Sequence, residues 1–300
     1  MSSQSVIGVD LGGTKIRAAL FDADGNVLER HEESTPTGSQ EAVLRGLAAA
    51  VETVLSDEVG ALGFGVPSVV DHRSGIALGS INIPLADVAL GRVMTERFGL
   101  PAAVENDANV AALAEWKRGA GRGADDLLLF TLGTGVGGGI VLGGQLFHGW
   151  AELGHVVVVA DGPPCQGNCT GRGHLESVAS GNAADRAAVQ LWGEGATAEA
   201  LVERAQDGDG AAIAALTTMG RLLGAGIGSL VNTFGAQLVI VGGGFGFAAM
   251  EFLLEPALEV ARREALGPAK GLRIVAAELG EDAGLIGAGL LAFDALGESR

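Results

Sequence analysis

Residues 7–20 read IGVDLGGTKIRAAL, and this stretch decides the fold. Two apolar runs flank a pair of adjacent glycines, a pattern that predicts two strands joined by a tight turn. An Asp-Gly pair at positions 24 and 25 then signals a further hairpin. The predicted elements are a strand at 5–10, a turn at 11–14, a strand at 15–21, a turn at 22–26 and a strand at 27–30.

The same pattern returns later in the chain. DLGGT at 10–14 lines up with TLGTG at 131–135, at an offset of 121 residues. The second copy predicts strands at 125–131, 137–142 and 145–147, with a glycine-rich turn at 132–136. The strand at 237–241 and its glycines resemble the strand at 61–65 and its turn. Two such halves predict a duplicated α/β fold with a cleft between the copies.

Helical spacing of apolar residues marks the segments between these strands. The predicted helices cover residues 40–55, 86–98, 108–118, 183–192, 198–206, 211–234, 247–264 and 283–296. Glycines at 220, 224, 226 and 228 cost the longest of these helices stability, so we expect them to allow close helix packing. The glycine-rich run at 119–123 is the best candidate boundary between the two halves.

Composition excludes several classes of protein. The formal charge is −17, with 19 basic and 36 acidic residues, and so acidic a surface disfavours nucleic acid and anionic lipid as partners. No signal peptide and no uninterrupted membrane-spanning segment is visible. Two cysteines make no disulfide framework and favour a reducing cytoplasm. We therefore expect a cytoplasmic protein that binds neither nucleic acid nor a membrane.

Three glycine-rich loops are candidates for binding phosphate. Two of them, at 10–15 and 133–139, end the first strand of each half, and a third lies at 242–246. Backbone N–H groups in such loops can cradle an anion, and the carboxylate of Asp10 could hold Mg²⁺ through water. A single loop of this kind is more often only a hairpin turn, but the run at 133–139 exceeds what a turn requires. A pair of loops facing each other would suit the β- and γ-phosphates of a nucleotide.

The third loop leaves two interpretations open. Its backbone could lie against an adenosine and a phosphate at a helix N-terminus. Gly244, Gly246 and Ala249 also satisfy the G-x-G-x-x-A pattern of dinucleotide-binding proteins. No acidic residue ends a following strand about 20 residues on, as that pattern requires, so the dinucleotide hypothesis is the weaker one.

Asp107 lies in VENDAN, residues 104–109, between a predicted strand and a predicted helix. An aspartate before a helix is usually an N-cap, worth about 1 kcal/mol. Here amide and carboxylate groups gather at the end of a strand beside the expected cleft, a common place for binding residues. Asp107 could accept the proton of a substrate hydroxyl during phosphoryl transfer, where the attacking oxygen becomes acidic late.

His155, Cys165, Cys169 and His174 supply two imidazoles and two thiols within 20 residues. This donor set suits a closed tetrahedral Zn²⁺ site, and the loop at 161–173 has almost no apolar core of its own. The alternative is a pair of ordinary thiols and two surface histidines. We expect His72 and His148 to be turn or surface residues, and the three tryptophans at 116, 150 and 192 to be packing residues.

The sequence motifs described above occur together in a known protein family. The chain resembles the ROK sugar kinases, especially the bacterial glucokinases, from about Val6 to Ala292. The motifs that carry the resemblance are IGVDLGGTKIRAAL, GFGVPSVVD, INIP, ENDANVAALAE, TLGTGVGGGI, AELGH and CTGRGHLE. It implies the actin-like ATPase (ribonuclease H-like) fold, with a small domain of residues 1–118 plus the helix 283–300 and a large domain of residues 119–282 that carries the cysteine loop.

The resemblance also implies roles for individual residues. Asp107 would be the general base, and the sugar hydroxyls would meet Asn82, Asn106, Asp107, Glu152, His155 and Glu176. The ATP phosphates would meet Asp10, Gly12, Gly13, Thr14, Lys15, Gly133, Thr134, Gly135, Gly137 and Gly138, and we add Gly243 and Gly244 near the adenosine. The family pattern C-x-C-G-x-x-G-C-x-E ligates zinc together with the histidine matching His155. Here Cys169 and Glu176 align, His174 replaces the third cysteine, and the nearest first thiol, Cys165, lies two residues early.

The expected activity is therefore transfer of phosphate from ATP, with Mg²⁺, to the 6-hydroxyl of D-glucose. Another hexose (mannose, fructose or N-acetylmannosamine) and polyphosphate as donor remain alternatives. A non-catalytic sugar sensor is an alternative of another class; the family's repressors carry an extra N-terminal DNA-binding region, for which the first strand near Ser5 leaves no room. The family suggests a homodimer or homotetramer.

Overall fold

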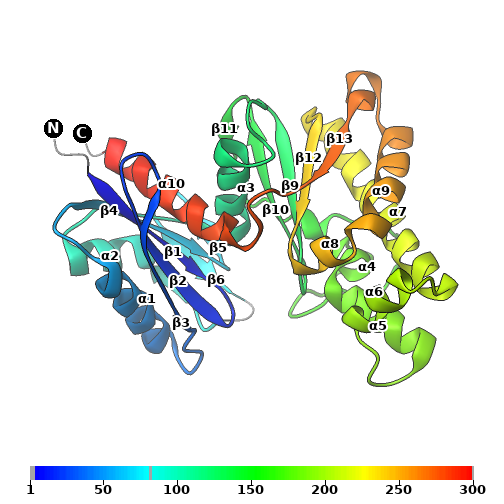
Figure 1. Cartoon of the computed structure of the whole chain (residues 1–300), viewed down its shortest axis with the longest axis horizontal. Coiled ribbons are helices and arrows are strands. Elements are labelled where there is room, and N and C mark those ends of the chain that lie inside the picture. The colour runs from blue at the N-terminus through cyan, green and yellow to red at the C-terminus, as the bar shows by residue number, and fades with distance from the viewer. Residues whose placement is uncertain (1–3, 81–82, 299–300) are drawn as a thin grey trace. The chain divides into compact units, whose positions relative to one another are not determined.

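The computed structural model describes residues 4–80 and 83–298 (Figure 1). They form two compact units. Unit 1 comprises Met1–Glu115, His148–Trp150 and Glu281–Arg300, and unit 2 comprises Trp116–Phe147 and Ala151–Gly280.

Unit 1 is built on a five-stranded sheet with the order β3-β2-β1-β4-β8. Its strands are β1 (Ser5–Leu11), β2 (Lys15–Phe21), β3 (Val27–Ser34), β4 (Val59–Val66) and β8 (Ala102–Asn106). The first three strands are antiparallel, whereas β4 and β8 run parallel to β1. Strands β1 and β4 are buried along their whole length because they lie in the middle of this mixed sheet and helices pack against them.

Helices and a small sheet complete unit 1. They are α1 (Gln40–Val54), β5 (Val69–Asp71), β6 (Ile76–Gly79), β7 (Ala86–Ala89), α2 (Leu90–Phe98), α3 (Asp107–Arg118), which continues into unit 2, and α10 (Ala283–Glu298). Helix α1 begins where the Ser39 hydroxyl accepts a hydrogen bond from the Ala42 N–H at 3.2 Å. Helix α10 packs against β1 and β4, so the C-terminal segment belongs to this unit.

Unit 2 repeats the sheet of unit 1 with the order β11-β10-β9-β12-β13. Its strands are β9 (Leu127–Leu132), β10 (Val136–Leu142), β11 (Gln145–Leu146), β12 (Leu238–Gly242) and β13 (Arg273–Ala276). The directions match as well, since β12 is parallel to β9 and β13 to β12. The duplication predicted from the two glycine-turn motifs is therefore confirmed, and β12 holds the place of β4.

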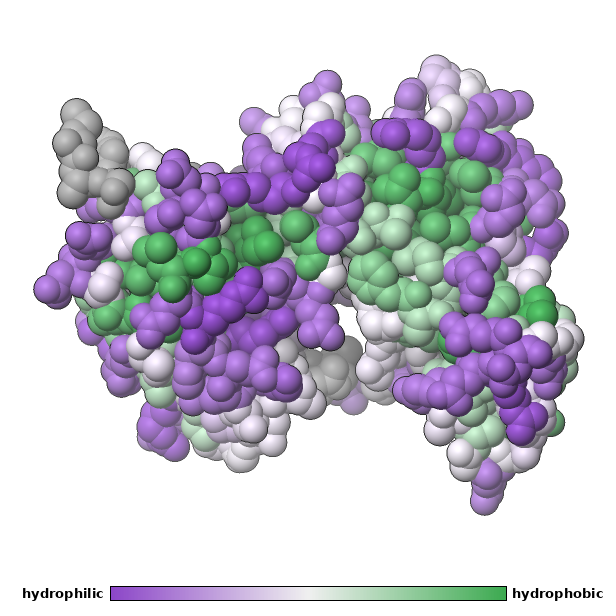
Figure 2. Space-filling view, viewed as in Figure 1, coloured by the Kyte–Doolittle hydropathy of each residue, from purple (hydrophilic) through white to green (hydrophobic). Residues whose placement is uncertain are grey.

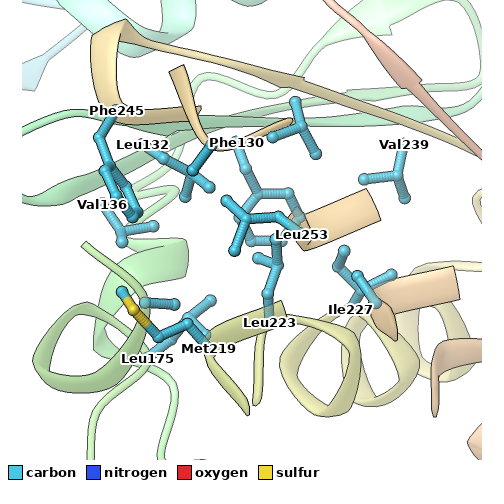
Figure 3. Packing of buried hydrophobic residues seen from close by; sticks show 14 of the residues in the cluster. Phe130, Leu132, Val136, Leu175, Met219, Leu223, Ile227, Val239, Phe245 and Leu253 are labelled. Atoms are coloured by element: carbon cyan, nitrogen blue, oxygen red, sulfur yellow. The ribbon is translucent and has the colours of Figure 1, made fainter. Parts of the chain in front are cut away.

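The helices of unit 2 cover its sheet. They are α4 (Glu176–Ala179), α5 (Gly181–Trp192), α6 (Ala198–Gln206), α7 (Gly210–Phe234), α8 (Gly244–Ala248) and α9 (Met250–Glu264), with short 3₁₀ turns at Leu153–His155, Gly267–Gly271 and Gly280–Asp282. In the core, Leu253 of α9 lies between Phe130 of β9 and Leu223 of α7 (Figure 3). The side chains of Leu132 and Phe245 extend the same cluster.

Helix α7 lies directly against α9, as its glycines predict. A side chain on Gly220 would place its Cβ 2.6 Å from the Leu253 carbonyl oxygen, and one on Gly224 would collide with the Ala257 carbonyl. Among the described residues, α7 is the one helix long and apolar enough to cross a membrane, and length and composition are all that this rests on. Its extensive packing against α9 is typical of a helix in the core of a globular unit.

Three predictions about elements were wrong in detail. Residues 86–89 form β7, paired with β6, so the helix predicted over 86–98 begins only at Leu90. The helix predicted over 247–264 is broken at Ala249, where φ is −98° and ψ is 6°, and its first part begins earlier, at Gly244. Trp150 is not a packing residue, because 72% of it is exposed.

The surface agrees with the acidic composition. On the face shown in Figure 2, hydrophilic residues surround apolar patches on each unit. The core clusters of both units consist of buried apolar residues, and in unit 1 they include Ile7, Leu62 and Phe64, which have no exposed surface.

Candidate functional site

The first glycine turn, between β1 and β2, is fixed by backbone hydrogen bonds. The Gly12 N–H donates to the Lys15 carbonyl at 2.8 Å, and the Thr35 hydroxyl donates to the Gly12 carbonyl at 2.7 Å. Gly13 and Thr14 are exposed at its tip. The Lys15 amine is held by Glu32 at 2.6 Å, so it must leave this exposed ion pair to reach a phosphate.

Asp10 is the last residue but one of β1 and lies beside this turn. Burial raises the pKa of its carboxyl above the usual value, and the charge of Arg17 opposes that shift. Arg17 donates to Oδ2 of Asp10 at 2.6 Å. A carboxylate oxygen is what Mg²⁺ prefers, and Oδ2 is already occupied by Arg17, so Oδ1 is the atom left to face a hydrated ion.

Strand β8 runs into helix α3 with no residue between them, and Asp107 is the first residue of the helix. The amide oxygen of Asn106 caps the helix, accepting from the N–H groups of Ala108 at 2.9 Å and Asn109 at 3.2 Å. Asn106 also donates from Nδ2 to the Ser68 carbonyl at 3.2 Å. The alternative that residue 107 is the N-cap was therefore wrong, because Asn106 caps the helix. Oδ1 of Asp107 accepts from the N–H of Ala108 at 2.8 Å.

Glu105 lies one residue earlier and is buried, with 3% of its side chain exposed. Its Oε2 lies 2.8 Å from Nδ1 of His148 and 3.3 Å from Nδ1 of His72. Burial acts to raise the pKa of Glu105, but hydrogen bonds from His148, His72, Asn109 and Asn106 overcome it and lower the pKa to about 2. Both histidines are exposed, and His72 lies in a turn, as predicted; the sequence did not indicate that they share this carboxylate.

In unit 2, the second glycine turn lines a cavity of about 430 Å³. Gly133 and Thr134 form one side, and Gly244 and Phe245 at the start of α8 form another. The remaining wall residues were not predicted from the sequence; they are Gly181, Asn182, Asp185, Ala198, Glu199, Val202 and Ala248. The sequence did contain a cue to this wall, since Ser180 is a typical N-cap residue and begins α5 by accepting a hydrogen bond from the Ala183 N–H. The next N–H, that of Gly181, donates to the Gly133 carbonyl at 2.7 Å and joins α5 to the second glycine turn.

Four predicted glycines do not line this cavity. Gly137 and Gly138 lie inside β10, paired with Thr131 and Phe130. Gly243 has a φ of +87° and joins β12 to α8. Gly135 lies against Glu176: a side chain at 135 would collide with Oε2 of that carboxylate.

Glu176 opens α4 and faces the second turn. Its Oε2 accepts a hydrogen bond from the Val136 N–H at 3.0 Å, and Oε1 lies 3.8 Å from the Cys165 sulfur. Glu152 is more exposed, and its Oε2 lies 3.9 Å from Nε2 of His155. These carboxylates and this imidazole belong to unit 2, whereas Asn106 and Asp107 belong to unit 1, and Asn82 lies outside the described residues.

The four predicted zinc ligands converge. Their donor atoms all lie within 4.8 Å of one another. Nδ1 of His155 lies 3.1 Å from Nδ1 of His174 and 3.8 Å from the Cys165 sulfur, and the Cys169 sulfur lies 3.6 Å from Nδ1 of His174. Tetrahedral Zn²⁺ places two nitrogens about 3.3 Å apart and a nitrogen about 3.6 Å from a sulfur. The residues present therefore fit the ion.

Without a metal ion, the surroundings of Cys165 favour its neutral thiol. Burial raises the pKa of the Cys165 thiol to about 11, and the neighbouring Cys169 adds to the shift. A bound metal ion reverses this, because a coordinating thiol loses its proton. His155 would coordinate such an ion through Nδ1, since Nδ1 faces His174 and Cys165 while Nε2 lies 3.9 Å from Oε2 of Glu152.

The fold and these motifs agree with the comparisons to known proteins. The ROK family model matches residues 6–295. The glucokinase of Streptomyces coelicolor is 35% identical over 95% of this chain and 96% of its own. A ROK hexokinase from Thermus thermophilus superposes with a TM-score of 0.85 at 36% identity, covering 98% of this chain and 100% of its own. A ROK family glucokinase from Streptomyces griseus, solved with glucose and AMPPNP, gives 0.81 at 36% identity, covering 97% and 99%. The chain has the actin-like ATPase fold and belongs to the ROK family.

Proposed function

We propose that the chain is a glucokinase that transfers the γ-phosphoryl group of ATP to the 6-hydroxyl of D-glucose. The observation that carries the proposal is the position of Asp107: a carboxylate at the start of α3, held in place by the Asn106 cap directly beside it. The family membership and the similarity to glucokinases support the choice of reaction. Units 1 and 2 are then the small and the large domain of the kinase.

Asp107 acts in this proposal as the general base. It accepts the proton of the 6-hydroxyl as that oxygen attacks phosphorus, and the leaving oxygen stays on ADP. The α3 N-terminus stabilises the carboxylate, which makes it a weak base. That is sufficient, because in a loose phosphoryl-transfer transition state the attacking hydroxyl becomes acidic late.

The sugar is bound, in this proposal, by groups that read its donors and acceptors. Glu176 and Glu152 accept from hydroxyls, and Nε2 of His155 meets a third. The side-chain oxygen of Asn106 accepts hydrogen bonds from α3, and one N–H of Nδ2 donates to the Ser68 carbonyl. The second N–H of Nδ2 can therefore donate to the sugar. We keep Asn82 in the set on the strength of the motif alone.

The nucleotide occupies the unit 2 cavity in this proposal. Gly133 and Thr134 lie against the phosphates, and Gly244 with Gly243 lies near the adenosine, where the start of α8 supplies N–H groups. Gly135, Gly137 and Gly138 shape the turn and its strand. In unit 1, Gly12, Gly13, Thr14 and Lys15 approach the γ-phosphate, and Asp10 holds hydrated Mg²⁺, which neutralises phosphate charge.

Zinc has a structural role in this proposal. His155, Cys165, Cys169 and His174 would hold the ion, which gives order to residues 161–173 and fixes the ring of His155 for the sugar. We further propose a cytoplasmic enzyme of glycolysis that acts as a homodimer or homotetramer and binds neither nucleic acid nor membranes. The −17 charge and the two unpaired thiols support this.

One experiment separates this function from its alternatives. Phosphorylation of glucose, mannose, fructose and N-acetylmannosamine is measured with ATP or polyphosphate as donor, and reduction of NAD⁺ is measured with the same sugars. We expect glucose and ATP to give the highest kcat/KM. In the Asp107→Asn variant, which keeps the size of the side chain, we expect kcat to fall roughly 10²–10⁴-fold while glucose still binds in calorimetry. A near-normal kcat would remove the proposed base, and no phosphorylation of any sugar by the wild type would favour a sensor.

A further inference from the structure

A second cluster of metal-ligand side chains lies in unit 1, outside the proposed zinc site. His72 lies in the turn between β5 and β6, Glu105 in β8, and His148 in the segment His148–Trp150 that belongs to this unit. The three residues are far apart in the sequence, yet one donor atom from each lies within 4.8 Å of the others. The proposed catalytic machinery uses none of them.

The distances in this cluster suit a small cation. Nδ1 of His148 and Nδ1 of His72 lie 2.8 Å and 3.3 Å from Oε2 of Glu105. A tetrahedral ion with ligands at about 2.0–2.1 Å places those ligand atoms about 3.3 Å apart. The distance between Nδ1 of His72 and Oε2 of Glu105 already has this length, and the one between Nδ1 of His148 and the same oxygen would lengthen by about half an ångström.

The other oxygen of the carboxylate is already fixed. Oε1 of Glu105 accepts from the Asn106 N–H at 2.8 Å and from Nδ2 of Asn109 at 3.0 Å. Such outer hydrogen bonds are what orient a ligating carboxylate. With 3% of its side chain exposed, Glu105 is a buried anion, and buried charges are paired or bound to a metal.

The imidazole rings supply the two other ligands. They are stacked, with centroids 3.5 Å apart and planes 13° from parallel. Two stacked imidazolium ions would repel each other, whereas two neutral rings that coordinate one ion do not. Binding turns the rings out of the stack so that both lone pairs meet the ion, and exposures of 36% and 38% leave room for this movement and for a water ligand.

We propose that His72, Glu105 and His148 form a second metal site, which binds a divalent transition-metal ion of the Zn²⁺ class with water as a further ligand. Two nitrogens and one carboxylate oxygen are a donor set that such ions take. The ion joins the β5–β6 turn, β8 and the segment at 148–150, and so acts as a staple within unit 1. This inference does not depend on the proposed kinase activity.

Cobalt distinguishes this site from the cysteine cluster. The full-length chain, stripped of metal with a chelator, is titrated with Co²⁺ while bound cobalt and near-ultraviolet absorption are followed. A site with thiolates gives a charge-transfer band, and a site with nitrogen and oxygen alone does not. We expect the wild type to bind two Co²⁺ per chain. The pair His72→Gln and His148→Gln, which keeps hydrogen-bond donors beside Glu105, should bind one with the band intact.

The reciprocal variant makes the test independent of how the histidine variant folds. The pair Cys165→Ser and Cys169→Ser should lose the band and still bind one Co²⁺. His31→Gln is the matched control, because His31 also faces a carboxylate, that of Glu33 at 3.5 Å, without a second imidazole; it should keep both ions. Binding of a single Co²⁺ by the wild type, two by the His72/His148 variant, or none by the cysteine variant would overturn the proposal.

Discussion

Oε2 of Glu176 accepts a hydrogen bond from the backbone N–H of Val136 at 3.0 Å, and this bond ties a proposed sugar ligand to the second glycine turn. The contact is possible only because residue 135 has no side chain, since a Cβ there would collide with the same oxygen. The position of Glu176 is thus set by the turn that we assign to the nucleotide.

Gly135→Ala should therefore displace Glu176. Loss of one hydrogen bond from a charged group to the sugar costs about 1.5–3 kcal/mol, so we expect the sugar KM to rise about 10–100-fold in steady-state kinetics. Gly271→Ala, also in unit 2, is the control: its Cβ would meet nothing within 4 Å, and it should leave the sugar KM unchanged. An unchanged sugar KM in Gly135→Ala would take Glu176 out of the sugar site.

Asn106→Ala should affect both stability and turnover. It removes the cap of α3, which costs about 0.5–2 kcal/mol in chemical denaturation, and it frees the first turn that holds Asp107, so kcat should fall. Ser39→Ala removes the comparable cap of α1. We expect a similar loss of stability there with kcat unchanged. Equal kcat in the two variants would argue against a positioning role for Asn106.

Removal of zinc should loosen the loop at 161–173. Two of the four candidate ligands lie in this loop and the other two flank it, and the loop has little apolar core of its own, so metal binding would supply its order. Limited proteolysis of chelator-treated protein should cut within the loop, and added Zn²⁺ should restore protection where Mg²⁺ does not. Equal resistance with and without metal would count against a structural site.

The contact between α7 and α9 should tolerate no added methyl group. Gly224→Ala drives a Cβ into the Ala257 carbonyl, and such overpacking costs about 1–3 kcal/mol. Gly210→Ala in the same helix meets nothing within 4 Å and should stabilise the chain by up to about 1 kcal/mol. Thermal unfolding should show a lower melting temperature for Gly224→Ala and a higher one for Gly210→Ala. Two shifts of the melting temperature in the same direction would contradict the packing described above.

The β2–β3 hairpin should depend on pH through Asp22. Hydrogen bonds from Asn26 hold the pKa of this carboxyl below its usual value of 3.8. Because the folded pKa is the lower one, the stabilisation is present above the unfolded value and is lost as pH falls through the folded value. Asp22→Ala should lower the melting temperature at pH 7, with a smaller difference below pH 3.8; a difference that does not change with pH would contradict this.

Much of the fold was predictable because it is local. The glycine turns after Asp10 and Thr131 predicted two equivalent sheets, because a turn that requires two glycines can be recognised in the sequence. Strands β5, β6 and β7 were missed because three or four residues are too few to show an alternation. Their pairing is decided by the rest of unit 1.

The candidate sites divide in the same way. His155, Cys165, Cys169 and His174 lie within 20 residues of one another in the sequence, so their spacing was informative. His72, Glu105 and His148 meet only because three distant segments fold together, and no spacing could indicate it. The capping role moved from Asp107 to Asn106 because the end of a strand cannot be placed to one residue from propensity alone.

The exposed indole of Trp150 provides an intrinsic fluorescent probe. With no tyrosine and three tryptophans, all ultraviolet emission comes from indoles, and the other two are held against Lys117 and Arg204. Trp150 is 72% exposed and stands between His148 and Glu152 in the sequence. Its emission colour should therefore report, without any label, whether its surroundings become drier when a sugar or a metal ion arrives.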